Sequence, residues 1–153
     1  MLLVGAGGAA AAIAVAVLGE GARQLCILNR SRERAEKLRE RLGGAHPEAA
    51  IAVHDASGPE AAARGADVIV NATYLGMRNG DPLPVPVSCL GTNTAVCDAV
   101  YKRGGETRFI KLAGERGLRT VPGGRMLLYQ GIQAQRIWTG KEPDARAMSD
   151  ALS

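Results

Sequence analysis

The stretch Leu2–Ala10, LLVGAGGAA, decides the fold. An apolar run, Leu2 to Val4, leads directly into the glycine-rich segment GAGGAA, and a strongly apolar helical run follows. A strand, a glycine turn and a helix in this order are the context in which G-x-G-x-x-G/A binds a dinucleotide. Gly5 permits the tight turn, Gly7 lets the backbone approach a pyrophosphate, and Ala10 lets the helix lie close to the sheet. The stretch therefore predicts a dinucleotide site, although glycine turns also join strands to helices for structural reasons alone.

The composition indicates one small α/β domain. A chain of 153 residues is long enough to bury a core, and 3% aromatic residues suit small-residue packing of helices on a sheet. The net charge is +4, and basic residues concentrate between Arg23 and Arg41. A nucleic acid and an anionic small molecule therefore compete as partners for that stretch. Because few aromatic side chains are available to stack on bases, we expect no nucleic-acid partner.

Cys26, Cys89 and Cys97 show no C-x-x-C spacing, so the sequence predicts no metal site. Cys26 and Cys97 lie within apolar runs and are expected to be buried, inert thiols. Unpaired cysteines favour a reducing cytoplasm. The apolar run 10–18 is too short to span a bilayer, so we expect a soluble, cytoplasmic protein with no membrane partner.

The remaining chain alternates apolar strand-like runs with helical segments, which predicts a Rossmann-like, doubly wound parallel sheet with helices on both faces. We expect six strands in the order 3-2-1-4-5-6. The helix near 9–18 is apolar on every face and is predicted to be buried, and Gly43 and Gly44 are expected to end the second helix. The strands are expected at 2–4, 25–28, 51–54, 67–70, 95–97 and 120–121, and the helices at 9–18, 31–42, 59–64, 107–117, 123–138 and 143–152.

The end of the second strand bears on the choice of cofactor. An NAD site carries Asp or Glu there, about 20 residues after the glycines, to bind the ribose 2′-hydroxyl. This chain has Asn29, Arg30, Ser31 and, one turn later, Arg34. A guanidinium can pair with a 2′-phosphate, which a carboxylate would repel. The pattern favours NADP(H), while Ser31 is also a suitable N-cap for a solvated helix.

Three further polar residues are candidates for ligand contact. Asn71 and Thr73 follow the fourth strand, and ligands of doubly wound sheets bind beyond the carboxyl ends of the strands. Gln130 is polar and lies early in an otherwise apolar helix, where an ordinary exposed residue fits the spacing equally well. A long loop, 76–93, separates the fourth and fifth strands and is of a length that is commonly functional or mobile.

At this point the chain resembles the cofactor domain of shikimate dehydrogenases over nearly its whole length. The first two motifs of the resemblance are shared with other NADP domains, including glutamyl-tRNA reductase, whereas the last three, in this order, are much more specific. Ser31 stands where the family has Thr, Ala11 where it often has a basic residue, and Lys102 where it often has Asn. The matched segments are GAGGAA, Asn29–Arg34, Asn71–Met77, Asp98–Tyr101, Gly123, Met126–Leu127, Gln130–Gly131 and Trp138–Gly140.

The resemblance implies a role for each matched position. The pyrophosphate would be held by Gly5, Ala6, Gly7, Gly8 and Ala9, and the 2′-phosphate by Asn29, Arg30, Ser31 and Arg34. The nicotinamide ribose and ring would be lined by Asn71, Ala72, Thr73, Ala99 and Gly123. The substrate would be faced by Tyr101 and Gln130.

The resemblance also implies what these residues do not supply. The family's catalytic Lys and Asp belong to a domain that precedes the glycine turn, so we assign no catalytic residue and expect the chain alone to bind cofactor without turnover. We expect an NADP-binding domain at 1–140 and a helical segment at 141–153 that would pack on a substrate domain. Alternatively, that segment packs against a second copy of the chain.

The reaction implied is the reduction of 3-dehydroshikimate to shikimate in the chorismate pathway of aromatic amino acid biosynthesis. Two alternatives stay open. One is the cofactor domain of a quinate/shikimate dehydrogenase or another NADP oxidoreductase, and the other is a stand-alone NADP-sensing or interaction module.

Overall fold

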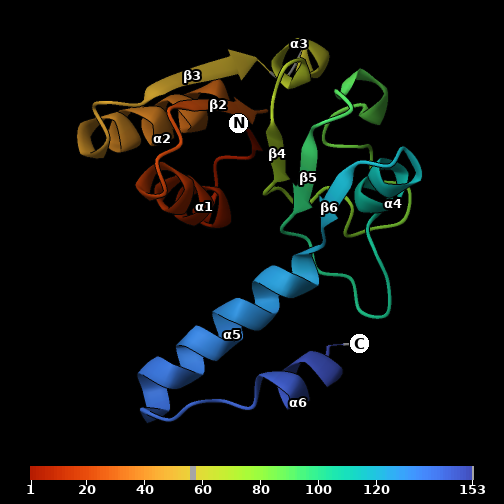
Figure 1. The fold of residues 1–153 in the computed structure, drawn as a ribbon. Helices are drawn as coiled ribbons and strands as arrows, with labels where there is room; N and C mark the ends of the chain where they lie inside the picture. The colour runs from red at the N-terminus through yellow and green to blue at the C-terminus, as the bar shows by residue number, and fades with distance from the viewer. Residues whose placement is uncertain (56–57, 153) are drawn as a thin grey trace.

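A computed structural model, which describes residues 1–55 and 58–152, contains a six-stranded parallel sheet (Figure 1). The strand order is β3-β2-β1-β4-β5-β6, and every neighbouring pair is parallel, which confirms the predicted doubly wound topology. The strands are β1 (Leu2–Val4), β2 (Gln24–Asn29), β3 (Ala50–Asp55), β4 (Val68–Asn71), β5 (Ala95–Asp98) and β6 (Arg119–Val121).

The helices follow local signals in the sequence. Ser31, Thr107 and Asp144 cap three of them, each accepting a hydrogen bond from a backbone N–H of the first turn. The loop 76–93 contains a 3₁₀ turn, and the second helix runs through Gly43 and Gly44 to Ala45 rather than stopping at the glycines. The helices are α1 (Gly8–Gly19), α2 (Arg32–Ala45), α3 (Pro59–Ala63), η1 (Val87–Cys89), α4 (Arg108–Glu115), α5 (Gly123–Thr139) and α6 (Ala145–Asp150).

Side chains of the central strand alternate between two cores. Leu2 and Val4 of β1 pack into a cluster that includes residues of α3, η1 and α4. Leu3, between them, packs into a second cluster formed with α1 and α2. Because successive strand side chains point to opposite faces, a short apolar strand is buried on both sides only when helices cover both faces.

Helix α1 is apolar throughout, yet it is buried on one face alone, so the prediction of a fully buried helix was wrong. Ala10, Ala14 and Leu18 are buried against the sheet, whereas the Val15 side chain is 54% exposed. An apolar composition indicates that a helix surface can be buried, but it does not indicate which elements pack on that surface. Here a single layer, the sheet with α2, provides the cover.

Helix α5 leads away from the sheet, and α6 returns beside it (Figure 1). Of the 17 residues of α5, only Gly123 and Ile132 are buried. The two helices meet closely at Gly131, where an added Cβ would lie 2.9 Å from the methyl carbon of Met148. Large apolar side chains of α5 remain exposed, among them Tyr129, Ile137 and Trp138. This helix pair therefore presents an apolar surface beyond the two cores.

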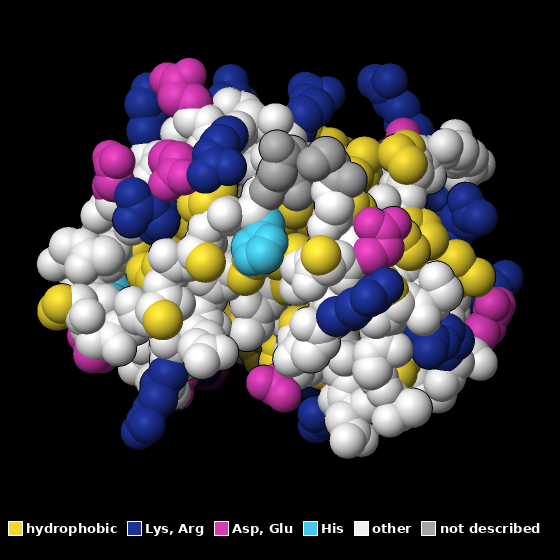
Figure 2. All heavy atoms as spheres, turned by 90° about the horizontal axis from the view of Figure 1, so that it is seen from above, with side chains coloured by type: hydrophobic (Ala, Val, Ile, Leu, Met, Phe, Trp, Pro, Cys, Tyr) yellow, Lys and Arg dark blue, Asp and Glu magenta, His cyan; other side chains and the backbone are white. Residues whose placement is uncertain are grey.

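The surface carries both signs of charge. Figure 2 shows Lys and Arg side chains around the rim of one face with acidic side chains between them. Within the described residues, no helix has the length and apolar character that crossing a membrane requires.

Gly123 offers a direct test of how α5 is joined to the sheet. A Cβ at Gly123 would lie 2.3 Å from the carbonyl oxygen of Val100, whereas one at Gly124 would make an ordinary 3.6 Å contact with the Tyr101 ring. We expect Gly123→Ala to lower the free energy of unfolding by about 1–3 kcal/mol, because the start of the helix must shift. We expect Gly124→Ala to be neutral or stabilising by up to about 1 kcal/mol, because alanine favours the helix.

Urea unfolding of the two variants beside the wild-type chain measures both values. Equal stability of the two variants would contradict the close packing of Gly123 on Val100.

Candidate functional site

The carboxyl ends of four strands bring the predicted site residues to one edge of the sheet. Val4 pairs in register with Leu28 and Asn71, and Asn71 with Asp98. Backbone hydrogen bonds continue this alignment past the strands, from Ala72 N to Val4 O at 2.7 Å and from Ala99 N to Asn71 O at 2.8 Å. The glycine turn, the segment after β4 and the segment after β5 therefore lie side by side.

The glycine turn has the shape that a phosphate site needs. Gly5 has φ +119°, and a Cβ there would lie 2.7 Å from the carbonyl oxygen of Ala72, so only glycine fits. A Cβ at Gly7 or Gly8 would meet nothing within 4 Å, so the backbone faces open space. The N-cap of α1 is Gly7, which has no side chain to occupy the first-turn N–H groups. Those groups and the positive end of the helix dipole suit an anion.

The basic stretch after β2 separates into paired and unpaired side chains. Arg32 pairs with Glu36 at 3.4 Å and Lys37 with Glu33 at 2.6 Å. The exposed side chains of Arg30 and Arg34 form no ion pair or hydrogen bond with any residue that the structure describes. Their charges are therefore available to an anionic group outside the protein.

Asn29 and Ser31 shape the backbone between these arginines. The Asn29 amide donates to the carbonyl of Ser31 at 2.8 Å, and the Ser31 hydroxyl accepts from the N–H of Arg34 at 3.4 Å. Both side chains thus fix the turn that leads into α2, as N-capping requires.

The side chain of Asn71 is fully buried and fully bonded. Its amide nitrogen donates to Leu75 O and to the Asp98 carboxylate, both at 2.9 Å. Its amide oxygen accepts from the Thr73 N–H at 3.1 Å and from the Thr73 hydroxyl at 2.7 Å. Because all four hydrogen bonds of an asparagine amide are made within the protein, Asn71 holds the turn in shape. Ala72 and Thr73 are half-buried at this turn, and the Thr73 hydroxyl also accepts from the Leu75 N–H at 3.0 Å.

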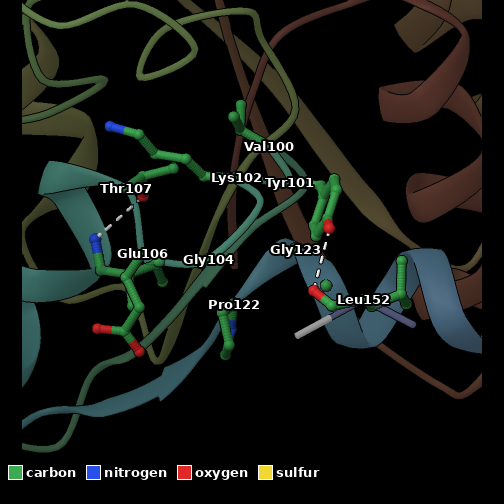
Figure 3. A pocket seen from close by; sticks show the side chains of 12 residues that line it. Val100, Tyr101, Lys102, Gly104, Glu106, Thr107, Pro122, Gly123 and Leu152 are labelled. Carbon is green, nitrogen blue, oxygen red and sulfur yellow. Dashed lines mark hydrogen bonds between the residues drawn. The ribbon is translucent and has the colours of Figure 1, made fainter. Parts of the chain in front are cut away.

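Tyr101 lies at a cavity of about 460 Å³ beyond β5, which Val100, Gly123 and Leu152 also line (Figure 3). The Tyr101 hydroxyl donates to the carbonyl of Leu152 at 3.0 Å, so the chain beyond α6 contacts the predicted substrate side. Lys102 reaches from the next position to the Asn79 side chain, at 3.0 Å. The long loop 76–93 is thereby joined to this side of the site.

Gln130 lies seven residues after Gly123, about two turns along α5, and is exposed. Its side chain has no hydrogen-bond partner among residues 1–55 and 58–152. The Tyr101 hydroxyl bonds to Leu152, just beyond α6, and not to Gln130.

Sequence reasoning did not assign a role to the Asp98 carboxylate. Asp98 is 3% exposed and accepts hydrogen bonds from Asn71, from Val100 N at 2.9 Å and from the Thr107 hydroxyl at 2.6 Å. Burial raises the pKa of Asp98, and these hydrogen bonds partly offset that rise. A usable signal was present, because Asp98 ends an apolar strand at the same edge as Asn71. Leu152 gave no such signal.

The cysteines offer neither a metal site nor a disulfide. Cys26, Cys89 and Cys97 are free thiols and only partly buried, which corrects the expectation that Cys26 and Cys97 are buried. Burial raises the pKa of both of those thiols, which lowers their reactivity. Within the described residues, no group of His, Cys, Asp and Glu could hold a metal ion.

Two family models match the two ends of the chain. The model for shikimate/quinate 5-dehydrogenase matches residues 1–76, and the model for the shikimate 5′-dehydrogenase C-terminal domain matches residues 123–152. The NADP(+) shikimate dehydrogenase of Rubrobacter xylanophilus is 57% identical over 152 residues, which are 99% of this chain and 53% of that protein.

Solved structures agree with the sequence matches. The quinate dehydrogenase of Corynebacterium glutamicum in complex with NAD has a TM-score of 0.90 and 36% identity, over 97% of this chain and 52% of that one. The shikimate 5-dehydrogenase of Thermus thermophilus in complex with NADP(H) and shikimate has a TM-score of 0.82 and 36% identity, over 99% of this chain and 53% of that one. The chain spans about half the length of these relatives. From its motifs, its fold and these matches, the chain belongs to the shikimate dehydrogenase family.

Proposed function

We propose that this chain is the NADP(H)-binding part of a shikimate dehydrogenase, which reduces 3-dehydroshikimate to shikimate. The observation that carries the proposal is that the exposed guanidinium groups of Arg30 and Arg34 have no partner among residues 1–55 and 58–152. They lie one strand away from Gly7, the N-cap of α1, which has no side chain to bond the first turn. The helix start suits a pyrophosphate, and the guanidinium pair suits the 2′-phosphate that distinguishes NADP from NAD.

The proposed contacts follow the order of the strands. The pyrophosphate is held by Gly5, Ala6, Gly7, Gly8 and Ala9, and the 2′-phosphate by Asn29, Arg30, Ser31 and Arg34. The nicotinamide ribose and ring lie against Asn71, Ala72, Thr73, Ala99 and Gly123, and the substrate is faced by Tyr101 and Gln130. NADPH supplies the hydride when it is bound, and these residues bind and orient it.

Specificity for NADP rests on charge. Asn29 stands where an acidic residue would accept from a ribose 2′-hydroxyl, and its amide is already engaged by the carbonyl of Ser31. Within the described residues, the side chains of Arg30 and Arg34 form no salt bridge, so pairing with a phosphate displaces none there. The relatives differ in cofactor. The Rubrobacter xylanophilus protein is named for NADP(+), which agrees with this proposal, whereas the Corynebacterium glutamicum structure holds NAD.

We propose that residues 1–140 form the cofactor domain and that residues 141–153, together with α5, pack on a substrate domain. The exposed side chains of Tyr129, Ile137 and Trp138 supply the apolar surface that such packing needs. In the family, the proton donor belongs to that other domain. Without it, the hydride acceptor has neither a positioned acid nor a pocket to orient it, so this chain alone has negligible turnover.

A quinate dehydrogenase is the second candidate. One observation favours it, namely the TM-score of 0.90 with the Corynebacterium glutamicum quinate dehydrogenase. Quinate and shikimate differ in the ring that the substrate domain recognises, so a comparison of the two substrates with that domain supplied separates the candidates.

The cofactor proposal is tested by calorimetric titration with NADP⁺ and NAD⁺. We expect the wild-type chain to bind NADP⁺ at least tenfold more tightly than NAD⁺, which corresponds to about 1.4 kcal/mol. Arg30→Ala and Arg34→Ala should each weaken NADP⁺ binding about tenfold or more and leave NAD⁺ binding nearly unchanged, because each removes one charged contact to the 2′-phosphate.

Arg32→Ala is the matched control. Arg32 lies between the other two arginines and is paired with Glu36, so its removal should change NADP⁺ affinity by less than threefold. Equal weakening by all three substitutions would indicate a general effect of positive charge and would contradict the specific assignment.

The activity proposal is tested by complementation. We expect no reduction of 3-dehydroshikimate by the purified chain with NADPH. Addition of the N-terminal half of the Rubrobacter xylanophilus relative should give measurable NADPH oxidation, because the two halves together provide cofactor, proton donor and substrate pocket. Trp138→Lys, on the exposed face of α5, should weaken this restored activity and leave NADP⁺ affinity unchanged. Turnover by the chain alone would overturn the proposal.

A further inference from the structure

The Asp98 carboxyl group is buried, and within the described residues it has no cationic partner. Its three hydrogen bonds come from the Asn71 amide, from the backbone N–H of Val100 and from the hydroxyl of Thr107, at 2.9, 2.9 and 2.6 Å. Asn71 is 0% exposed and Thr107 is 2% exposed, so the donors are shielded from water along with the acceptor. A buried polar group of this kind is compatible with a stable fold only when hydrogen bonds from its neighbours compensate for the loss of water.

The three donors belong to three separate segments. Asn71 begins the turn after β4, Val100 belongs to the chain after β5, and Thr107 caps α4. Asp98 therefore ties together segments that no single helix or strand connects. Thr107 also caps α4 through Ile110 N, at 3.4 Å, so the network is anchored in the core beneath that helix.

Chemistry decides which way the Asn71 amide points. Asp98 Oδ1 accepts hydrogen bonds, so it faces the NH₂ end of the amide and directs the amide oxygen toward Thr73. An amide at position 98 would present a donor as well and would remove this discrimination. The shape of the turn 71–75 thus depends on a hydrogen bond to a residue 27 positions later in the chain.

Both segments held by Asp98 border the candidate site on their other side. The carbonyl oxygen of Ala72 lies too close to the backbone at Gly5 to leave room for a Cβ there, and the carbonyl oxygen of Val100 does the same at Gly123. Tyr101 follows Val100 directly and lines the cavity beyond β5 (Figure 3). Asp98 is therefore bonded to backbone beside the candidate site, whereas the stretch 29–34 lies at the end of another strand, β2.

We infer that Asp98 is a positioning residue for the nicotinamide end of the cofactor, acting through Asn71 and Val100 without touching the cofactor itself. The inference rests on the proposed NADP(H) function. Asp98 fixes the separation between the turn after β4 and the segment Val100–Tyr101, between which the ring lies. The adenosine end, held by Arg30 and Arg34, is independent of it.

The test compares two ligands that share the adenosine end. Adenosine 2′,5′-bisphosphate carries the 2′-phosphate and lacks the nicotinamide half, whereas NADP⁺ has both. We expect Asp98→Asn and Thr107→Val to weaken NADP⁺ binding at least tenfold and to change binding of the bisphosphate less than twofold, by calorimetry on the full chain. Thr107→Ser, which keeps the hydroxyl donor, should bind both ligands as the wild-type chain does.

Val87→Ala is the control for stability alone. Val87 is 5% exposed and packs in the same core as α4, outside the network. It should lower stability and leave the ratio of the two affinities unchanged. If Asp98→Asn does not fold, Thr107→Val retains the test, since valine matches threonine in shape and removes only the hydroxyl.

The outcomes separate the two proposals. The positioning role would be overturned if Asp98→Asn bound NADP⁺ as tightly as the wild-type chain does, or if Thr107→Val did so where Asp98→Asn does not fold. It would also be overturned if the substitution weakened binding of NADP⁺ and of the bisphosphate equally. Failure of the wild-type chain to bind either ligand would overturn the proposed cofactor function, and the positioning role with it.

Discussion

The contact between Gly5 and the backbone of Ala72 is the constraint on which the site depends. Strands β1 and β4 are neighbours in the sheet, and beyond their ends the chain must turn toward α1 on one side and into the segment 71–75 on the other. These turns approach so closely that a Cβ at Gly5 would lie 2.7 Å from a carbonyl oxygen. A side chain there would separate the two strand ends, and with them the two walls of the crevice that doubly wound sheets use for ligands.

The two ends of this crevice differ in physical character. Around Arg30 and Arg34, the side chains are exposed and positively charged, and they have no ion-pair or hydrogen-bond partner in the part of the chain that the structure describes. Around Asn71 and Asp98, the groups are buried and hydrogen-bonded to one another. Long exposed side chains can attract an anion and adapt to it, whereas a buried network holds the backbone in one arrangement. The first arrangement suits recognition of a phosphate, and the second suits placement of a reacting ring.

The features that could be predicted from the sequence are those that depend on neighbouring residues. The glycine turn at Gly5, the caps at Ser31 and Thr107, and the strand order follow from short patterns and from the topology that they permit. The extent to which α1 is buried could not be predicted, because the sequence of an apolar helix does not show on how many of its faces other elements pack. The bond from Tyr101 to Leu152 joins residues 51 positions apart, and no local pattern encodes such a pair.

The sparse burial of α5 has a consequence for how the molecule opens. Between Ile132 and the end of the helix at Thr139, its side chains add little to the cores, and its contacts beyond itself are chiefly with α6. Backbone amides there exchange with solvent by local fraying of the helix pair, at a free-energy cost below that of global unfolding. Amides of β1 and β4, enclosed by both cores, exchange only when the whole sheet opens. A partner that covered α5 would therefore register first as slower exchange in this helix.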